Sequence, residues 1–420
     1  MGVVGLGYVG LPLSLGVHDA GFTVMGVDIK SDRVDAINSG QQLLKYLPAD
    51  RIANARDSGR YQATTDIANL SDADIVLVSV PTSIDHDDQP DISILFRAAG
   101  DLAPVVRPGA LVIIESTVYP GAIREKIAPI FTDAGHVLGQ NLFLAFSPER
   151  EDPGNASFHT RNIPKLVGAD DPTSLEMAAM FYRQVVEEVV EVSSTTVAET
   201  VKVYENSFRT VNIALANEMK SVCQALGIDV HEMIAAAATK PFGFMPFWPG
   251  PGIGGDCIPV SPVLLTARVK ELGASLPIVE HAIVSSRAIP AGVVARAAEA
   301  AGGTLSGKKV LLLGISYKKD VGDVRRSPAV DILELIATEG GACDYHDPLV
   351  PVFAAAGSTE EHRSVDLTET ALSAYDLVIV ATDHTDVDYQ LVGRQAPIIV
   401  DTRNVFAAGK IPVSGMLVSA

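Results

Sequence analysis

The chain has 420 residues, of which 47% are hydrophobic and 20% are charged. This length suggests two or three domains, and the composition is typical of a folded soluble protein rather than a disordered one. Because 51 Asp and Glu outnumber 32 Lys and Arg, the formal net charge is −19, which disfavours nucleic acids and anionic membranes as partners, since both are bound by clustered basic charge.

The first part of the chain alternates short apolar runs with amphipathic segments. Continuous apolar runs of this kind predict buried strands of a parallel sheet that is covered by helices on both faces. The expected strands are residues 2–4, 24–27, 75–80, 111–114 and 142–146. The first strand begins almost at the N-terminus, so we expect no signal peptide, and no apolar run approaches the length of a spanning helix. A cytoplasmic protein is therefore expected.

Residues 195–226 carry no strand signal and predict one long helix, with Thr195 or Thr196 as its N-cap and Gly227 just past its end. At this length it spans about 45 Å, enough to bridge two domains. A second helix is expected over residues 230–238. A loop rich in Pro, Gly and Phe follows over residues 241–259, and then more helix to about residue 300.

The strand–helix pattern returns after Gly302-Gly303, with strands expected at residues 309–314, 342–346, 377–381 and 398–400. The predicted fold class is α/β, with two doubly wound parallel-sheet domains joined by a helical middle domain that holds the long central helix. The expected domains are residues 1–194, 195–302 and 303–420.

A glycine-rich turn, Gly5-Leu6-Gly7-Tyr8-Val9-Gly10, fits G-x-G-x-x-G between an expected strand and an expected helix. The first Gly permits the tight turn, the second lets a pyrophosphate approach the backbone, and the third allows the helix to pack closely on the strand. Asp28 ends the next strand, where a carboxylate accepts hydrogen bonds from a ribose 2′-OH and repels a 2′-phosphate. These features predict a Rossmann-like site for NAD rather than NADP; a plain turn with a solvated acid is the alternative.

The turn after Leu313 has one glycine followed by Tyr317, Lys318 and Lys319, which is no dinucleotide fingerprint. We expect this second α/β domain to hold a different phosphate or sugar. A solvated run of lysines is the alternative.

The loop Pro249-Gly250-Pro251-Gly252-Ile253-Gly254-Gly255-Asp256-Cys257 brings backbone N–H groups close to a ligand and ends on a cysteine. A thiol near a helix start and a cation is activated as a nucleophile. We interpret Cys223 and Cys343 as packing residues. Three cysteines make no disulfide framework and no zinc spacing, so no metal is expected.

Polar residues on the long helix, Lys202, Asn206 and Arg209, share one face at i, i+4 and i+7. Apolar residues on several other sides of the helix favour a buried site, and a solvated stripe is the alternative. Residues 115–117 and 147–152 place further polar side chains at expected strand ends, where ligands of open α/β sheets bind. Glu149 is a candidate for activating a water; an exposed loop acid is the alternative.

Taken together, these motifs resemble the UDP-glucose/GDP-mannose dehydrogenase family over essentially the whole chain. The matching pieces are residues 5–10, Pro81-Thr82, Glu115-Ser116-Thr117, Ser147-Pro148-Glu149, Lys202-x-x-x-Asn206, Gly254-Gly255-x-Cys257, Tyr317-Lys318-Lys319-Asp320 and Asp401-Thr402-Arg403. Residues 147–155, 239–247 and 400–404 look most like the UDP-N-acetylglucosamine 6-dehydrogenase branch.

The resemblance implies a four-electron oxidation of the sugar C6 alcohol by two NAD⁺ in turn, giving a uronic acid used in polysaccharide biosynthesis. Cys257 would form a thiohemiacetal and then a thioester. UDP-glucose and UDP-N-acetylmannosamine are alternative substrates. Family members are usually dimers built through the long central helix, so we expect a homodimer.

The resemblance also assigns roles to individual residues. The implied catalytic residues are Cys257, Lys202, Asn206, Glu149 and Thr117. The implied cofactor-binding residues are Gly5, Gly7, Tyr8, Val9, Gly10, Asp28, Arg33, Pro81, Thr82 and Ser116. The implied substrate-binding residues are Arg150, Arg209, Phe247, Gly254, Tyr317, Lys318 and Arg403.

Three positions depart from the family pattern. Ser261 stands where the family commonly has Asp, Asp256 where close relatives often have His, and Arg326 where Glu is frequent. Ser261 before Pro262 can still cap a helix, whereas a carboxylate beside Cys257 disfavours the thiolate. Two other functions therefore stay open: a two-electron dehydrogenase of the hydroxyacid type, which needs no cysteine, and a non-catalytic nucleotide-sugar-binding relative.

Overall fold

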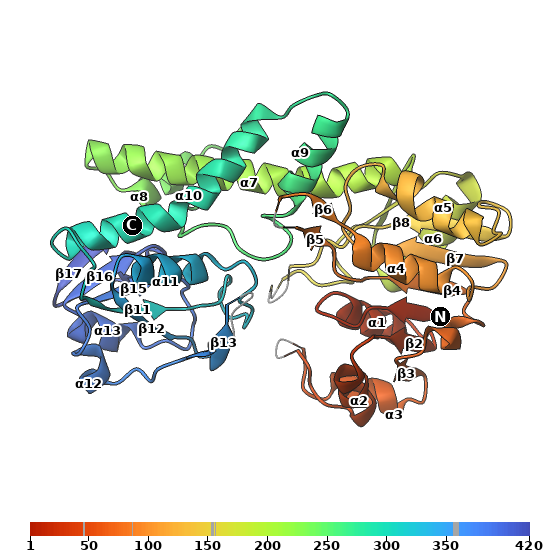
Figure 1. The fold of residues 1–420 in the computed structure, drawn as a ribbon, viewed down its shortest axis with the longest axis horizontal. Coiled ribbons are helices and arrows are strands. Elements are labelled where there is room, and N and C mark those ends of the chain that lie inside the picture. Colours follow the sequence, from red (N-terminus) through yellow and green to blue (C-terminus); the bar gives the residue numbers. More distant parts are fainter. Residues whose placement is uncertain (45–46, 86, 153–154, 156, 356–360) are drawn as a thin grey trace. The chain divides into compact units, whose positions relative to one another are not determined.

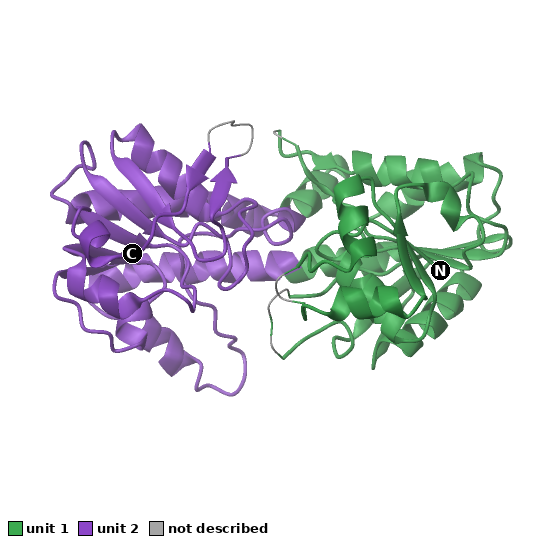
Figure 2. Ribbon diagram, turned by 90° about the horizontal axis from the view of Figure 1, so that it is seen from below, with its two compact units in different colours: residues 1–205, 263–275 green, residues 206–262, 276–420 purple. Residues whose placement is uncertain are grey.

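The computed structural model describes residues 1–44, 47–85, 87–152, 155, 157–355 and 361–420. The chain divides into two compact units (Figure 2). Unit 1 comprises Met1–Glu205 and Val263–Ser275, and unit 2 comprises Asn206–Pro262 and Leu276–Ala420. Each unit contains one large sheet that is mainly or wholly parallel, so the α/β fold class predicted from the sequence is confirmed.

Unit 1 is built on an eight-stranded sheet in the order β10-β9-β8-β7-β4-β1-β2-β3. The strands are β1 (Gly2–Val4), β2 (Val24–Val27), β3 (Tyr61–Thr64), β4 (Ile75–Val78), β7 (Ala110–Ile114), β8 (Leu142–Phe146), β9 (Lys165–Ala169) and β10 (Val189–Val192). All five expected strands are present. β3, β9 and β10 were not expected, and the pairing of β8 with β9 is antiparallel in an otherwise parallel sheet.

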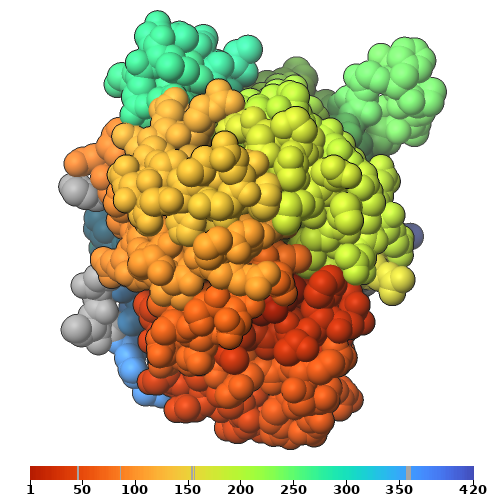
Figure 3. All heavy atoms as spheres, turned by 90° about the vertical axis from the view of Figure 1, so that its right-hand side faces the viewer, coloured from red at the N-terminus to blue at the C-terminus, as the bar shows by residue number. Residues whose placement is uncertain are grey.

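Helices cover both faces of this sheet, because successive strand residues point to opposite sides. Val3 and Ile113 join one apolar cluster with helices α1 (Gly10–Asp19) and α6 (Pro172–Val185). Val4 and Ile114 join the other with α4 (Ser93–Leu102) and α5 (Ala128–Asp133). On the face seen in Figure 3, the red to yellow-green segments of unit 1 form a continuous surface. The remaining elements are α2 (Ser31–Ser39), α3 (Arg51–Asp57), the short helices η1 (Ile67–Leu70) and η2 (Ile123–Ile127), and the hairpin of β5 (Ser83–Ile84) and β6 (Pro90–Asp91).

The long helix α7 runs from Thr195 to Leu226, as the sequence predicts, and the division between the units falls inside it. Gly227 ends α7 in the left-handed conformation (φ 70°), which glycine adopts without a steric penalty. The expected later helices are α8 (Val230–Ala237), α9 (Ser261–Glu271) and α10 (Pro277–Ala300), and residues 241–259 form the expected loop.

Unit 2 contains a five-stranded, fully parallel sheet in the order β12-β11-β15-β16-β17 (Figure 1). Its strands are β11 (Lys309–Leu313), β12 (Ala342–His346), β15 (Leu377–Val380), β16 (Ile398–Asp401) and β17 (Met416–Ser419), of which only β17 was not expected. The other elements are α11 (Pro328–Thr338), α12 (Glu369–Leu372), α13 (Tyr389–Gln395), α14 (Val405–Ala408) and the antiparallel pair β13 (Val352–Ala354) and β14 (Glu361–Arg363).

Helix α10 is the one helix among the described residues that is long and apolar enough, by length and composition, to cross a membrane. Its Val293, Val294 and Ala297 pack into the apolar cluster of unit 2, together with Ala329 and Ile332 of α11. The C-terminal half of α10 therefore has an apolar partner within its own unit, whereas Ile278 and Val284 in its N-terminal half are exposed.

Candidate active site

The glycine turn of unit 1 leaves one open position. Gly5 has φ 91°, and a Cβ there would lie 2.3 Å from the Ser79 carbonyl oxygen; a Cβ on Gly10 would lie 1.8 Å from the Gly5 oxygen. Among the described residues, a Cβ on Gly7 would meet only Arg33 Nη1, at 4.0 Å. Gly5 and Gly10 are thus required by packing, whereas Gly7 faces free space beside the N-terminus of α1, which suits a pyrophosphate.

Asp28 fixes this turn from the end of β2. Its Oδ2 accepts hydrogen bonds from Leu6 N at 2.9 Å and Arg33 Nη1 at 2.8 Å, and its Oδ1 accepts from Lys30 N at 3.0 Å. Asp28 is buried, so it is no solvated turn residue. Tyr8 is exposed and Val9 occupies the N-cap position of α1. The predicted cofactor-binding residues of the first two strands therefore lie around one turn.

Four further predicted residues meet at the carboxyl ends of β4 and β7. Ser116 Oγ accepts a hydrogen bond from Val80 N at 3.0 Å and donates one to Val80 O at 2.8 Å. Thr82 Oγ1 donates to Thr117 O at 2.5 Å. These bonds hold the segment of Pro81 and Thr82 against that of Ser116 and Thr117, on the sheet edge that carries the glycine turn.

A buried ion pair lies at the same edge. Glu149 and Lys202 are 7% and 5% exposed; Lys202 Nζ lies 3.4 Å from Glu149 Oε2 and also donates to the Glu149 carbonyl oxygen. Ile114 pairs with Phe146, so Thr117 and Glu149 each stand three residues beyond a paired strand end. Glu149 is therefore not an exposed loop acid. Arg150 donates to Pro164 O at 2.8 Å and Glu205 Oε1 at 2.5 Å.

Sequence reasoning missed the buried polar network behind Glu149. Lys165 Nζ lies 2.6 Å from Glu115 Oε2, and the Tyr182 hydroxyl donates to the same carboxylate. Burial raises the pKa of Glu151 to about 6, against the lowering effect of its hydrogen bond from Thr160. Lys165 and Tyr182 belong to segments with no chemical motif, so no local signal marks them. Pro153 and Gly154 of the family-like stretch 147–155 lie outside the described residues.

The polar stripe of α7 is buried at its first two members only. Lys202 and Asn206 are both buried, whereas Arg209 is exposed. Asn206 Nδ2 donates to Ser261 Oγ at 2.8 Å and to Cys257 O at 3.4 Å, and Ser261 N donates to Cys257 O at 3.0 Å. Asn206 and Ser261, the first residue of α9, therefore hold the end of the cysteine loop in unit 2.

The cysteine loop lies against the turns of the second sheet. A Cβ on Gly254 would lie 2.4 Å from Tyr317 Cβ, and one on Gly250 would lie 3.0 Å from Arg403 Nη1. Cys257 at the end of the loop is exposed. The other two thiols differ: Cys223 is buried, and burial raises the pKa of Cys343 to about 12. Upstream of the loop, the Phe247 ring contacts that of Phe208 with centroids 5.7 Å apart.

The predicted substrate residues of unit 2 stand at the carboxyl ends of β11 and β16. Tyr317 N donates to Asp323 O at 2.9 Å, and Arg403 Nε donates to Ala381 O at 2.8 Å. Burial holds the pKa of the Tyr317 hydroxyl above its usual range. Lys318 follows Tyr317 and is half-buried. Tyr317, Lys318 and Arg403 thus come from two strand ends that lie on one side of this sheet.

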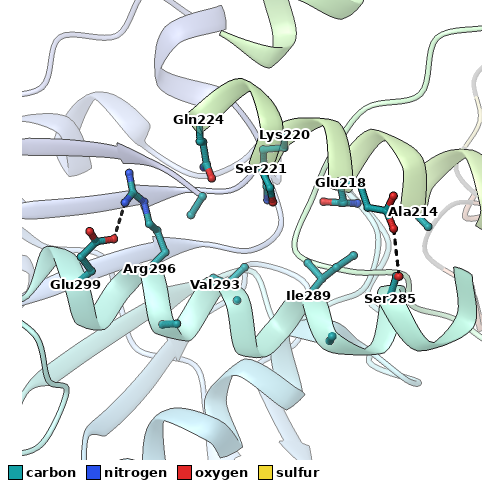
Figure 4. A pocket seen from close by; sticks show the side chains of 15 residues that line it. Ala214, Glu218, Lys220, Ser221, Gln224, Ser285, Ile289, Val293, Arg296 and Glu299 are labelled. Carbon is teal, nitrogen blue, oxygen red and sulfur yellow. Dashed lines mark hydrogen bonds and ion pairs between the residues drawn. The ribbon is translucent and has the colours of Figure 1, made fainter. Parts of the chain in front are cut away.

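A separate groove of about 570 Å³ lies between α7 and α10 in unit 2 (Figure 4). Lys220, Ser221 and Gln224 of α7 line one side, and Arg296 and Glu299 of α10 line the other. Burial lowers the pKa of Lys220 to about 8. No residue predicted to bind cofactor or substrate lines this groove.

Models of one protein family match three consecutive parts of the chain. The NAD binding domain of the UDP-glucose/GDP-mannose dehydrogenase family matches residues 1–186, its central domain matches residues 196–287, and its UDP binding domain matches residues 311–408.

Individual relatives agree with these matches. The chain is 33% identical to a UDP-N-acetyl-D-mannosamine dehydrogenase of Pyrococcus horikoshii, with 96% of this chain and 95% of the relative covered. It is also 33% identical to a UDP-N-acetyl-D-glucosamine 6-dehydrogenase of Pseudomonas aeruginosa, covering 91% and 90%. A solved structure of a UDP-D-ManNAc dehydrogenase from Pyrococcus horikoshii has a TM-score of 0.89 at 30% identity, covering 100% and 98%. The chain therefore belongs to the UDP-glucose/GDP-mannose dehydrogenase family and is an NAD-dependent UDP-sugar dehydrogenase.

Proposed function

We propose that this enzyme oxidises the C6 alcohol of a UDP-sugar to the carboxylate in two steps, with UDP-N-acetylglucosamine as the first candidate substrate. The observation that carries the proposal is Cys257, an exposed thiol at the end of a loop held by Asn206 and Ser261. A two-electron alcohol oxidation needs no such thiol, whereas a four-electron oxidation must hold the aldehyde so that it can be oxidised again. The relatives named above act on either the gluco or the manno N-acetylated sugar, so UDP-N-acetylmannosamine and UDP-glucose are the alternative substrates.

The glycine turn, Asp28 and Arg33 would hold the cofactor, together with Pro81, Thr82 and Ser116. When bound, NAD⁺ supplies the hydride acceptor for both oxidations. The open position at Gly7 and the carboxylate of Asp28 support this role, because they offer space for a pyrophosphate and an acceptor for ribose hydroxyls.

The sulfur of Cys257 forms the covalent intermediates. Its thiolate adds to the C6 aldehyde, and the carbonyl oxygen takes up a proton to give a thiohemiacetal. Loss of the C6 hydride and of the hydroxyl proton leaves a thioester. A water placed by Thr117 and Glu149 then attacks, which releases the uronate and returns the thiolate. Lys202 and Asn206 stabilise the negative oxygen formed at C6 in each addition, since preorganised donors act where charge develops.

We assign substrate binding to the last of the three proposed domains, residues 303–420. Tyr317, Lys318 and Arg403 hold the UDP group, with two cations to meet its phosphates. Arg150, Arg209, Phe247 and Gly254 are proposed to contact the sugar. The free cysteines fit the reducing cytoplasm, which is the proposed location.

The function is tested with a panel of UDP- and dTDP-sugars, following NADH by absorbance and the product by mass spectrometry. We expect two NADH per uronate with the true substrate; one NADH per product would contradict the full cycle and indicate a two-electron dehydrogenase. Cys257→Ser should abolish uronate formation while leaving NAD binding unchanged. Cys343→Ser, a thiol in the same unit with no proposed role, is the matched control and should keep full turnover. Tight binding of NAD and UDP-sugar without any NADH would indicate the non-catalytic relative.

We further propose that the enzyme is a homodimer through α7. Six large apolar side chains stay exposed along this helix at helical spacing: Val197, Tyr204, Phe208, Leu215, Val222 and Leu226. Steps of four and seven residues place them on one side of the helix, and a second copy with the same stripe would cover them. Leu215→Glu should convert the dimer to a monomer in light scattering, whereas Glu218→Gln, on the same helix, should not. A wild-type monomer would contradict this.

A further inference from the structure

An ion-pair cluster lies beside the cysteine. The carboxylate of Asp256, the residue before Cys257, accepts a hydrogen bond from Arg325 Nη1, and its Oδ1 lies 3.7 Å from Arg326 Nε. Arg325 also donates to Asp323, with Nη2 2.6 Å from Oδ2. Asp256 and Arg326 are two of the three positions at which the chain departs from the family pattern, and the structure brings them together.

Backbone contacts join the same two segments. Gly255 N donates to Arg325 O at 3.1 Å, and a Cβ on Gly254 would lie 2.9 Å from Arg326 O. Arg326 has φ 48°, a left-handed conformation that a side chain such as arginine adopts only when its surroundings enforce it. The cysteine turn is therefore fastened to the 317–326 loop by both side chains and backbone.

The two acidic and two basic side chains of this cluster have a net charge of zero. Asp256 and Asp323 are opposed by Arg325 and Arg326, so the carboxylate next to Cys257 does not act on the thiol alone. Among the described residues of unit 2, Tyr317 is a further titratable group of this cluster, and its environment includes Asp323, Cys257, Arg325 and Asp256. Asn206 and Ser261 contact the backbone of the cysteine and carry no charge; Lys202 stands one turn before Asn206 on α7.

We propose that Asp256 is a positioning residue that acts through Arg325 and Arg326: it fastens the cysteine turn to the 317–326 loop and sets the balance of charge at the Cys257 thiol. Its importance for turnover rests on the proposed function. Its effect on thiol reactivity does not, because that effect is measured without substrate.

The test is the pH dependence of Cys257 alkylation by iodoacetamide, read by mass spectrometry of the Cys257 peptide in the full-length enzyme. In Asp256→Asn the guanidinium charges are opposed by one carboxylate fewer, so the thiolate is favoured. We expect the midpoint of alkylation to fall by about half to one pH unit, as for one charge at a partly solvated site. Arg326→Gln should shift the midpoint the other way. Glu361→Gln breaks the exposed pair of Glu361 with Arg363 in the same unit and should leave the profile unchanged.

A double-mutant cycle shows whether Asp256 acts through Arg325. In an Arg325→Gln background the tie is already broken, so Asp256→Asn should lower kcat by less than threefold, whereas its direct charge effect on the alkylation midpoint should persist. An unchanged alkylation profile in Asp256→Asn, or full additivity of the two substitutions in kcat, would overturn the proposal. In turnover, Asp256→Asn should lower kcat by about tenfold, with the KM for NAD unchanged. If the wild type forms no NADH with any sugar, the proposed function fails while the alkylation result still decides this inference.

Discussion

The first strand of each large sheet, β1 in unit 1 and β11 in unit 2, is followed by the same kind of glycine turn, but the two turns have different surroundings. After β1, Gly5 (φ 91°) donates its N–H to Val27 O at 2.8 Å, and after β11, Gly314 (φ 81°) donates its N–H to His346 O at 2.8 Å. In each case an aspartate follows directly on the neighbouring strand, Asp28 after β2 and Asp347 after β12. The local geometry of the two strand–turn pairs is therefore equivalent.

The difference lies in what the aspartate binds. Asp28 accepts from two backbone N–H groups and Arg33. Asp347 is completely enclosed by six donors, namely Ile315 N, Ser316 N, Ser316 Oγ, His384 Nε2, Leu349 N and Val350 N. His384 Nδ1 accepts from Asp320 N at 3.0 Å, which leaves Nε2 to donate to Asp347. Asp28 lies beside an open turn. The carboxylate oxygens of Asp347, by contrast, all accept hydrogen bonds from its own loop and its neighbours.

The helix that follows each turn completes the contrast. α1 starts at Gly10, directly after the first turn, so its N-terminus is offered to a ligand. α11 starts only at Pro328, and the intervening loop carries Tyr317, Lys318 and Arg325. We therefore expect one α/β turn to serve backbone recognition of a dinucleotide in unit 1 and the proposed side-chain recognition of the substrate in unit 2. Loop length, rather than sheet topology, decides between them.

The largest expected effect comes from breaking both turns in parallel. Gly5→Ala and Gly314→Ala each force alanine into the left-handed region and place its Cβ 2.3 Å and 2.5 Å from a carbonyl oxygen. We expect each to lower the free energy of unfolding of its own unit by about 3 kcal/mol or more. Calorimetry with and without NAD should show that only Gly5→Ala loses NAD binding. Gly21→Ala is also at a positive φ, but no described atom lies within 4 Å of the added Cβ, so it should cost only about 1–2 kcal/mol. NAD binding by Gly5→Ala with the wild-type Kd would contradict the assignment.

Asp347→Asn tests whether this acid is structural. Burial alone would raise the pKa of Asp347, but hydrogen bonds from His384, Ser316 and Leu349 hold it below the usual range. The stabilisation is therefore present above the unfolded value of about 3.9 and is lost as the pH falls toward the folded value. At pH 7 we expect Asp347→Asn to lower the free energy of unfolding by about 2–4 kcal/mol, because the NH₂ group of the amide would face the N–H and O–H donors that now bind the carboxylate. Below pH 4 the difference between variant and wild type should narrow in urea titrations. A constant difference between pH 7 and pH 2.5 would contradict this.

Much of the fold follows from local patterns. The central strands β4, β7 and β15 are continuous apolar runs, and α7 ends just before Gly227 as expected. The expected cap at Thr195 or Thr196 is wrong by one or two residues, because the hydroxyl that accepts a hydrogen bond from Val197 N, at 3.2 Å, is that of Ser194. In the two large sheets, the missed strands are the edge strands β3, β10 and β17 and the antiparallel β9; the short pairs β5–β6 and β13–β14 were also missed. An edge strand such as Tyr61–Thr64 is partly exposed to solvent, so apolar and polar residues can alternate along it. Such a strand lacks the continuous apolar run by which the buried strands were predicted.

The candidate site likewise has parts that local sequence patterns predict and parts that they do not. Gly5 and Asp28 are predictable because the spacing of their motif follows from one strand–turn–helix unit. The contact of Asp256 with Arg325 joins segments 69 residues apart, and the tie between Lys165 and Glu115 spans 50 residues. No local periodicity encodes such pairs. Expecting Asp256 to act alone on Cys257 was incomplete for this reason: its counter-charges come from a distant loop.

Asp28→Asn addresses the cofactor side of the comparison. The substitution keeps the shape of the side chain and removes the charge that we propose repels a 2′-phosphate, while Arg33 stays beside Gly7. We expect the ratio of kcat/KM for NAD over NADP to fall by about 10- to 100-fold, equivalent to about 1–3 kcal/mol. Asp32→Asn changes an exposed acid in the first turn of α2 and is the matched control. An unaltered ratio in Asp28→Asn would show that this carboxylate does not face the ribose.

The smallest effect is expected at Asp320, in the long loop of unit 2. Asp320 has φ 58°, and its carboxylate accepts from Thr385 N at 2.8 Å and Thr385 Oγ1 at 2.7 Å. Asn tolerates the left-handed region as Asp does, and its amide can still accept from the backbone N–H while donating to the hydroxyl oxygen. Asp320→Asn should therefore change the free energy of unfolding by less than about 1 kcal/mol, whereas Asp320→Ala, which loses both bonds, should cost about 2 kcal/mol in the same urea titration. Equal losses in the two variants would mean that charge, rather than backbone conformation and hydrogen bonding, holds this loop, and the contrast between the two turns would then be electrostatic.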